Sequence, residues 1–353
     1  MPKSPRRKDG YFEKSLTDAR TGKRVHFYAK SERELTRKIM EYTGKQERGR
    51  TFSEVAAEWR NTHYENLAYT TQRGYEASYN RALDEFGDVP VKNITTLDIK
   101  AHLSRMAAQK QSPTTLKPMQ YSAKTLKAQQ LIYSLILGYA AEQGDISVNP
   151  ANALKMPRAQ KATVKRQPAG EEDEAIIKAS ADIWLLPFFL LYTGLRKGEA
   201  LAIQQKDIDR EHGIIHITKS LYHEVNNPHI KTPKTIAGVR TVPILAPLLP
   251  KLPEGDPDDY LFHSLNPTKP LTKSEFQRAW ERFTRKTGIT CTAHQLRHSF
   301  ATLLFDAGID VKDAQDILGH STEAMTRDVY THIREMRRRD TANKLNEYLS
   351  NIR

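Results

Sequence analysis

Apolar residues recur at helical spacing along most of the chain between residues 51 and 157. Phe52, Val55, Ala56 and Trp59 begin one such stripe, and further stripes run over residues 75–86, 97–108 and 122–143. Apolar side chains that return every three or four residues lie on one face of an amphipathic helix. The pattern therefore predicts a helical domain over residues 51–157, and this domain contains no cluster of residues typical of catalysis.

A short alternating pattern precedes this domain. Residues 11–16 and 24–29 are predicted strands, separated by the turn formers Asp18, Thr21 and Gly22. A helix over residues 31–42, capped by Ser31, is expected to follow. The polar segment 44–50 contains glycine, and we interpret it as a linker. Residues 1–48 then form a small domain of sheet plus helix, which is marginally stable unless it docks or binds something.

A second break separates the helical domain from the rest of the chain. Three prolines lie among basic residues between positions 148 and 170, which is typical of an exposed linker, assigned to residues 158–170. Beyond it we expect a helix that starts with the acidic run 171–174, a buried helix at 185–191 and a helix at 273–287. Residues 213–218 and 239–244 are predicted strands joined by a long polar loop, 220–238. The fold class is multidomain and mainly α with small β-sheets, and residues 171–353 form a mixed α+β domain.

The richest chemistry follows in residues 294–330. On a predicted helix at 293–306, Leu296, Phe300, Leu303 and Leu304 face a core, while His294, Arg297, His298 and Ala301 fall on or beside the opposite face. Gly308 ends this helix. Asp310 caps the next helix, which stops at Gly319 and leaves His320 on a tight turn.

A third apolar stripe contains Met325, Val329, Ile333 and Met336. Tyr330 lies one position round from it, so the pattern predicts a tyrosine half turned from the core, with its hydroxyl available to a bound anion. A further helix over residues 334–349 carries Leu345, Tyr348 and Leu349.

Charge and composition narrow the partner. Among 353 residues, 55 are Lys or Arg and 42 are Asp or Glu, a formal net charge of +13, which favours a polyanionic partner such as nucleic acid. Cys291 is the single cysteine, so an intramolecular disulfide is excluded and a reducing compartment fits. No apolar run approaches the length that spans a bilayer, and we expect a cytoplasmic protein that does not bind membranes.

Two more cations stand out. Arg196 follows a buried apolar run and a turn, and Glu199 lies one helical turn further on, so this arginine is either rigidly held for a phosphate or part of a structural ion pair. Lys234 lies in the polar loop, where a lone lysine is usually a solvated charge.

Two other chemistries use the same segment. His294 and His298 have the i, i+4 spacing of helical zinc ligands, but Gln295 stands where a zinc protease has glutamate, and we assign His298 to structural support. Cys291 as a thiol nucleophile lacks an evident third partner.

The motifs TGLRKGEAL at 193–201, HQLRHSFATLL at 294–304, LGHS at 318–321 and DVYTH at 328–332 resemble those of the tyrosine recombinases, in particular phage and conjugative-element integrases. The order Arg, Lys, His-x-x-Arg, His, Tyr is similar throughout the last domain. The layout also resembles the integrase branch, which has an arm-type DNA-binding domain (residues 1–48 here), a helical core-binding domain (51–157) and a catalytic domain (171–353). Gln295 and Ser299 replace residues that are often Asp and Thr, and we expect neither to matter for the chemistry.

The resemblance implies a role for each matching residue. Tyr330 would be the nucleophile that forms a 3′-phosphotyrosyl link with DNA. Arg196 and Arg297 would hold the non-bridging oxygens, His294 would assist proton transfer, and His320 would bond the phosphate. Lys234 would protonate the 5′ oxygen, although Lys231 is a close competitor. No metal or cofactor is implied.

The resemblance also implies partners and a process. Double-stranded DNA would be bound at core and arm attachment sites, by a homotetramer that exchanges strands through a four-way junction to integrate and excise a mobile element such as a phage genome. An excision factor and a host DNA-bending protein are candidate accessory partners. Two alternatives stay open: a non-catalytic architectural DNA-binding protein and a metal-dependent nuclease.

Overall fold

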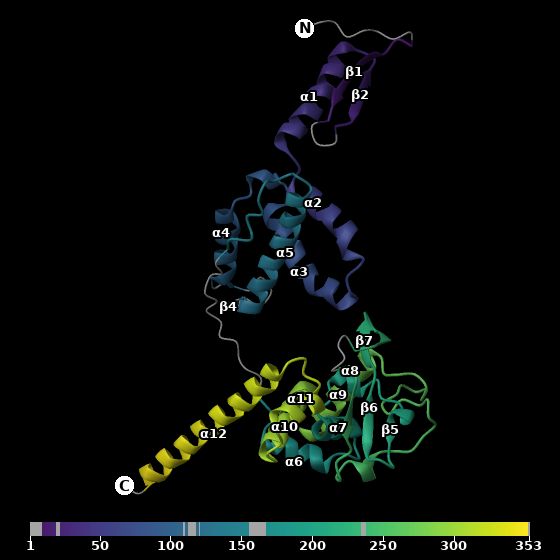
Figure 1. Ribbon diagram of the computed structural model, residues 1–353, viewed down its shortest axis with the longest axis vertical. Helices are drawn as coiled ribbons and strands as arrows, with labels where there is room; N and C mark the ends of the chain where they lie inside the picture. The colour runs from purple at the N-terminus through teal and green to yellow at the C-terminus, as the bar shows by residue number, and fades with distance from the viewer. Residues whose placement is uncertain are drawn as a thin grey trace. The chain divides into compact units, whose positions relative to one another are not determined.

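The computed structural model describes residues 9–18, 22–108, 110–111, 118–119, 121–154, 167–233 and 238–351. The chain divides into two compact units, residues 1–164 and 165–353, and each is described by itself (Figure 1). Most of the linker predicted at 158–170 lies outside the described residues, of which only 167–170 are included.

The first elements of unit 1 are a hairpin and a helix. β1 (Phe12–Thr17) pairs antiparallel with β2 (Arg24–Ala29), and α1 (Glu32–Arg48) follows. Ala29 and Leu35 are buried between them. Both predicted strands and the helix are confirmed, but the linker predicted at 44–50 is wrong, because α1 continues to Arg48. Lys45 to Arg48 are strong helix formers, and they carry the helix past Gly44.

The rest of unit 1 is helical, as predicted. Its helices are α2 (Phe52–Trp59), extended by a π-helical turn (Arg60–Tyr64), α3 (Tyr69–Phe86), α4 (Thr96–Ala107) and α5 (Ala123–Glu142), with a short β3–β4 pair (Lys110–Gln111 and Pro118–Met119) and a 3-10 turn (Val91–Asn93). Phe52, Ile99, Tyr133 and Ile136 are fully buried in one core. Helix α3 begins six residues before the predicted start at 75.

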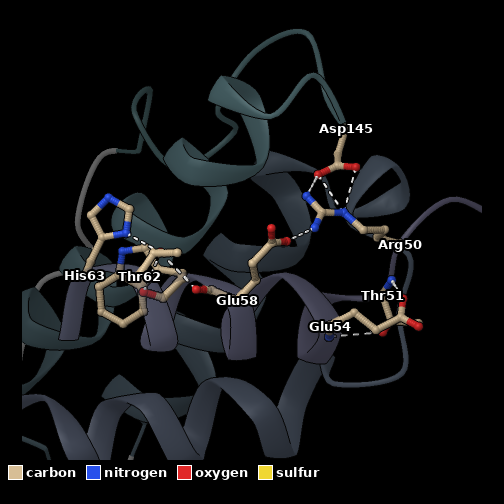
Figure 2. Close-up of polar contacts among 8 residues, drawn as sticks. Arg50, Thr51, Glu54, Glu58, Thr62, His63 and Asp145 are labelled. Atoms are coloured by element: carbon tan, nitrogen blue, oxygen red, sulfur yellow. Dashed lines mark hydrogen bonds and ion pairs between the residues drawn. The ribbon is translucent and has the colours of Figure 1, made fainter. Parts of the chain in front are cut away.

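Polar contacts fix the start of this helical bundle (Figure 2). The Nε of Arg50 donates to both carboxylate oxygens of Asp145, at 2.9 and 3.0 Å, and its Nη1 pairs with Glu58. Thr51 and Glu54 form a capping box at the start of α2, in which the Thr51 N–H donates to the Glu54 carboxylate at 2.8 Å. These contacts join the first turns of α2 to the segment that follows α5.

Unit 2 combines helices with small sheets. Its first helices are α6 (Glu171–Ala179), α7 (Leu185–Thr193) and α8 (Lys197–Ala200), and α9 (Lys273–Thr287) follows the strands. β5 (Ile208–Asp209), β6 (Ile214–Ile217) and β9 (Arg240–Pro243) form an antiparallel sheet in the order β5-β6-β9, and 3-10 turns lie at Gln205–Asp207 and Leu249–Lys251. The predicted helices and strands are confirmed.

The long polar loop predicted at 220–238 is wrong. Residues Ser220–Glu224 and Asn227–Lys231 pair as an antiparallel hairpin, β7–β8. The turn between them contains Val225, whose φ is +55°, and Asn226. Leu221 lies between polar neighbours, as in the alternating pattern of a strand. The pattern is so short and polar that the composition of the segment still predicts a loop.

The last helices carry the predicted functional residues. They are α10 (Ala293–Asp306), α11 (Val311–Leu318) and α12 (Glu323–Asn351), with caps at Gly308, Asp310 and Gly319 as predicted. The helix expected at 334–349 is the distal part of α12, which extends from the body of unit 2 to the C-terminus (Figure 1). In the part of the chain that the structure describes, no helix is long and apolar enough to cross a membrane.

Gly194 allows α7 and α10 to approach closely. It caps α7 with a φ of +62°, a left-handed conformation that favours glycine. A Cβ at this position would lie 2.1 Å from Cδ1 of Phe300, a buried residue of α10. The next residues of the chain, including Arg196, are therefore placed by a contact that only glycine permits.

We predict that Gly194→Ala destabilises the protein more than Gly213→Ala. Both residues have a φ near +60°, but a Cβ on Gly213 would meet no atom within 4 Å. The control substitution should cost about 1 kcal/mol for the backbone conformation, and Gly194→Ala should cost about 1–3 kcal/mol more through overpacking. Urea unfolding measures both; equal midpoints would contradict the close-packing argument.

Candidate active site

Arg196 lies between the cap of α7 and the first turn of α8. Its Nη1 donates to Oε1 of Glu199 at 2.7 Å, and its Nη2 donates to the carbonyl of Gly319 at 2.9 Å. The predicted hold by Glu199 is confirmed. The side chain keeps 43% of its surface exposed, so the guanidinium is fixed on one edge and open to solvent on the other.

Arg297 is buried, although the sequence placed it on or beside the face of α10 opposite the predicted core. Its Nη1 donates to the carbonyl of Gly194 at 2.8 Å and its Nη2 to the carbonyl of Leu318 at 2.7 Å. The second face of α10 is also covered, because Ala301 and the residues of α11 and α12 form another apolar cluster. Burial, followed by the charge of Arg196, lowers the pKa of Arg297 to about 9, which still leaves it charged at neutral pH.

His320 follows the left-handed cap of α11 at Gly319. Its Nδ1 lies 2.8 Å from the hydroxyl of Thr326, which is fully buried in the first turn of α12. Burial lowers the pKa of His320 to about 4, with further lowering by the charges of Arg297, Arg196 and Arg240. The imidazole is therefore neutral at pH 7 and offers its other ring nitrogen to a ligand.

His294 and His298 complete a pocket of about 190 Å³. Their rings are perpendicular, with centroids 4.8 Å apart. The pocket is lined by Arg196, His294, Arg297, His298, Ala301, Leu318, His320, Met325 and Val329. The structure therefore brings together four of the six predicted site residues, from the N-cap of α8, from α10 and from the turn after α11.

Tyr330 is not part of this pocket, and the prediction that it is half turned from the core is wrong. The residue is 6% exposed, its hydroxyl donates to the carbonyl of Ile309 at 3.3 Å, and its ring packs edge-on against Phe305. Burial, with a smaller effect of Asp310, raises the pKa of Tyr330. Tyr330 is only one position round the helix from the apolar stripe, and a wide buried face of a helix still includes a residue at that angle.

Lys234 lies outside the described residues, which end at 233 and resume at 238. Its competitor Lys231 is at the end of β8, where its Nζ lies 5.2 Å from the centroid of the Tyr222 ring. The choice between the two lysines stays a prediction.

The described residues also bear on the two competing chemistries, a metal site and a thiol nucleophile. Among the described residues, no three His, Cys, Asp or Glu side chains form a group that could hold a metal ion. Cys291 is buried, and burial, with the charge of Asp173, raises its pKa to about 12, so its thiol is protonated at neutral pH.

Two residues make contacts that were not predicted, and one of them, Arg240, bonds the carboxylate that holds Arg196. Arg240 donates to the carboxylate of Glu199 and to the carbonyl of Ile317. Ser299 accepts a hydrogen bond from the Ala169 N–H at 3.0 Å, which fixes the entry of the chain into unit 2. The alternation along 240–244 places Arg240 on the same face as the buried Val242, and a charged residue on an apolar strand face is the signal that could have found it.

The arrangement is suited to a phosphate group. Two guanidiniums and a neutral histidine converge on one small pocket, and a bound anion would counteract the burial and the repulsion from Arg196 that lower the pKa of Arg297. Arginine has five N–H donors, so the carbonyl contacts described above leave donors on Arg297 for such an anion.

We predict that His320 makes stability depend on pH between about 6.5 and 4. Because the folded pKa lies below the unfolded one, the unfolded state takes up a proton first as the pH falls, and about 3 kcal/mol of the stability present above pH 6.5 is lost. His320→Gln should remove this slope in urea unfolding, whereas the exposed His263→Gln should retain it. A wild-type slope in the His320→Gln protein would refute the assignment.

Comparisons with known proteins come from both sequence and structure. The model described as the phage integrase family matches residues 170–337, and the phage integrase N-terminal SAM-like domain matches residues 51–107. Together these matches cover more than half of the chain.

Individual proteins are similar over most of their length. A tyrosine recombinase XerC-like protein of Caldanaerobacter subterraneus subsp. tengcongensis is 25% identical, over 77% of this chain and 76% of the relative. The fold is similar to that of the Tn1549 transposon integrase in complex with a circular intermediate DNA, with a TM-score of 0.64 and 23% identity over 82% of this chain and 99% of that one. It is also similar to a lambda integrase tetramer bound to a Holliday junction, with a TM-score of 0.58 and 19% identity over 92% and 96% of the two chains. The chain belongs to the phage integrase family of site-specific tyrosine recombinases.

Proposed function

We propose that this recombinase cuts and rejoins double-stranded DNA through a 3′-phosphotyrosyl link to Tyr330, and so integrates and excises a mobile element. The observation that carries the proposal is the pocket in which Arg196, Arg297 and His320 converge from segments far apart in the sequence. A structural ion pair alone would account for Arg196 and Glu199, but not for a second buried arginine and a neutral histidine beside it.

The cations would act on the scissile phosphate. The non-bridging oxygens of the phosphate carry negative charge throughout the transfer. Guanidiniums held at fixed positions stabilise this charge without having to reorganise during the reaction. Two backbone carbonyls would set the direction in which the N–H donors of Arg297 face the phosphate. Glu199 would do the same for the donors of Arg196. His320 would donate a hydrogen bond from the ring nitrogen that does not face Thr326.

The covalent step balances without a cofactor. The oxygen of Tyr330 forms a bond to phosphorus, and the bond from phosphorus to the 5′ oxygen breaks. The phenolic proton would pass to His294, and the 5′ oxygen would take a proton from Lys234. Attack by a 5′-hydroxyl on the phosphotyrosine reverses the step, so the bond energy is retained and ATP is not needed.

Tyr330 must move before it can attack. Its hydroxyl is bonded to Ile309 and its ring lies in the cluster of Phe305, outside the pocket that holds the arginines. The start of α12 would therefore have to shift or rotate when DNA binds. In this arrangement the pocket could bind a phosphate while Tyr330 lies outside it. This separation would protect DNA from cleavage before the complex has assembled.

Different parts of the chain would contact different DNA sites. Residues 1–48 would contact arm sites, and residues 51–157 and 171–353 would contact a core site. A tetramer on DNA would exchange strands through a four-way junction, with an excision factor and a host DNA-bending protein as candidate accessory partners. The net charge of +13 supports contact with a polyanion, and the lambda integrase tetramer on a Holliday junction is the structural parallel.

The distal half of α12 would join neighbouring subunits. Leu345, Tyr348 and Leu349 are 58–66% exposed on the part of this helix that extends from unit 2. An apolar group on an extended helix is suited to docking on a second copy of the chain.

We predict that wild-type protein forms a covalent adduct with a nicked suicide duplex in the presence of a metal chelator, and that Tyr330→Phe does not. The duplex carries a site selected from random sequences by binding to Tyr330→Phe. A strand labelled at its 5′ end should migrate with the protein on a denaturing gel, because the link is to the 3′ phosphate. The matched control, Tyr348→Phe on the exposed part of α12, should retain the adduct.

Other outcomes would favour the alternatives. Binding without an adduct in any variant would support an architectural DNA-binding protein. Free cleaved DNA that appears only after metal is restored would support a metal-dependent nuclease, and an adduct with Tyr330→Phe would exclude Tyr330 as the nucleophile.

We predict that deletion of residues 341–353 abolishes pairing of two DNA duplexes but preserves binding to a single core site. The double variant Leu345→Asp/Leu349→Asp should behave in the same way, because a charge opposes burial of an apolar contact. Asn343→Asp is the control. Native gels separate singly bound from paired complexes and so measure binding and pairing. Unchanged pairing of duplexes by the deletion variant would refute the docking proposal.

A further inference from the structure

The carbonyl end of α11 is surrounded by arginines. The carbonyl of Ile317 accepts from Nε of Arg240 at 2.8 Å, that of Leu318 from Nη2 of Arg297 at 2.7 Å, and that of Gly319 from Nη2 of Arg196 at 2.9 Å. The last carbonyls of a helix lack partners within the helix and carry partial negative charge, which favours cations. Three consecutive carbonyls thus hold three guanidiniums at fixed positions.

The buried carboxylate of Glu199 links two of these arginines. Its Oε1 accepts from Nη1 of Arg196 at 2.7 Å, and its Oε2 accepts from Nη2 of Arg240 at 2.9 Å. Oε2 also accepts from the backbone N–H of Arg196 at 3.0 Å. Burial raises the pKa of Glu199, but the hydrogen bond and charge of Arg240 and the charge of Arg196 outweigh it, and the pKa is lowered overall. The carboxylate is therefore ionised and divided between the two cations.

Arg240 reaches this position because of strand register. It pairs with Ile217 across the β6–β9 ladder, and Val242 pairs with Ile215, so Arg240 lies on the apolar face of the sheet. The planar fork of arginine, with donors fixed in different directions, is well suited to bonding a carboxylate and a backbone carbonyl at once. Its side chain also packs against Gly319, where a Cβ would lie 2.7 Å from Cζ of Arg240.

Arg240 lies outside the pocket that would receive the DNA phosphate. Its side chain is 6% exposed, compared with 43% for Arg196, and it does not line the pocket of the candidate site. Its Nη1 is buried and makes no hydrogen bond among the described residues. A buried guanidinium with an unsatisfied nitrogen costs free energy, so its retention calls for a benefit elsewhere.

We propose that Arg240 is a positioning residue for DNA cleavage, which fixes the Glu199 carboxylate and the carbonyl end of α11 so that Arg196 and His320 face the scissile phosphate. The inference rests on the proposed function and adds a residue to it. Arg240 would act indirectly on two groups that face the phosphate. It would position Arg196 through Glu199, and it would position the turn that carries His320 through its contacts with Ile317 and Gly319.

The test compares Arg240→Gln, Arg240→Lys and the control Arg210→Gln on the selected suicide duplex. Arg210 is an arginine of the same unit that also donates to a side-chain oxygen and a backbone carbonyl, those of Gln205 and Pro253, but it has no contact with Glu199. The adduct formation rate at saturating DNA and the Kd for the duplex are measured separately, and circular dichroism at the assay temperature checks that each variant is folded.

We expect Arg240→Gln to lower the rate at saturating DNA about 100-fold, the scale of a misplaced catalytic group, and to leave Kd within about 3-fold, because the phosphate-binding arginines remain. Arg240→Lys should recover about 10-fold of that loss, since it restores the charge beside Glu199 but cannot bond Ile317 as well. The double variant Glu199→Gln/Arg240→Gln should be no slower than the slower single variant, because both act through one contact.

Each contrary result is distinct. A wild-type rate in folded Arg240→Gln would overturn the inference. A parallel loss of folding and of DNA binding in both Arg240→Gln and Arg240→Lys would assign Arg240 a structural role only. If the wild-type protein itself forms no adduct, the proposed function fails, and the positioning role fails with it.

Discussion

The site depends on one electrostatic constraint, which is to keep three arginines close together in a partly dry environment. Like charges at such range repel, and removing them from water costs further free energy. The protein offsets this with two sources of negative charge, the carboxylate of Glu199 and the carbonyl end of α11. Neither source alone is sufficient, because one carboxylate cannot neutralise three guanidiniums and a helix end carries only about half a charge.

This incomplete compensation explains the properties of the pocket. Burial first, and then the uncompensated charge of the neighbouring arginines, lowers the pKa of Arg297 and that of His320, which keeps the histidine neutral beside cations. In the proposed function, the single negative charge of a DNA phosphodiester would supply part of the missing negative charge, so that binding of DNA would improve the electrostatic balance of the pocket. The rigidity comes from backbone acceptors: Gly194, Leu318 and Gly319 hold the arginines by carbonyls whose positions are set by helix ends.

Tyr330, the proposed nucleophile, obeys a different constraint. Tyr330 packs with Phe305, Leu304 and Ile333 in an apolar cluster and bonds Ile309, so its resting position is stabilised by burial rather than by the cations. Moving it into the pocket exchanges apolar contacts for proximity to a phosphate. If Tyr330 is the nucleophile as proposed, a site built in two parts, with a rigid anion pocket and a separately packed tyrosine, would make cleavage conditional on a rearrangement of α12.

The sequence by itself determined the local elements, because helix caps and apolar periodicity act over a few residues. The helix boundaries at Asp310 and Gly319 and the hold of Arg196 by Glu199 follow from such short-range chemistry. The motifs also identified the family. Only the tertiary structure decided that Arg297 is buried, that Tyr330 faces a core and that Arg240 joins the site, because each depends on which second surface covers an element. Periodicity identifies one buried face of a helix or strand, but a partner packed on the other side is set by contacts between residues far apart in the chain.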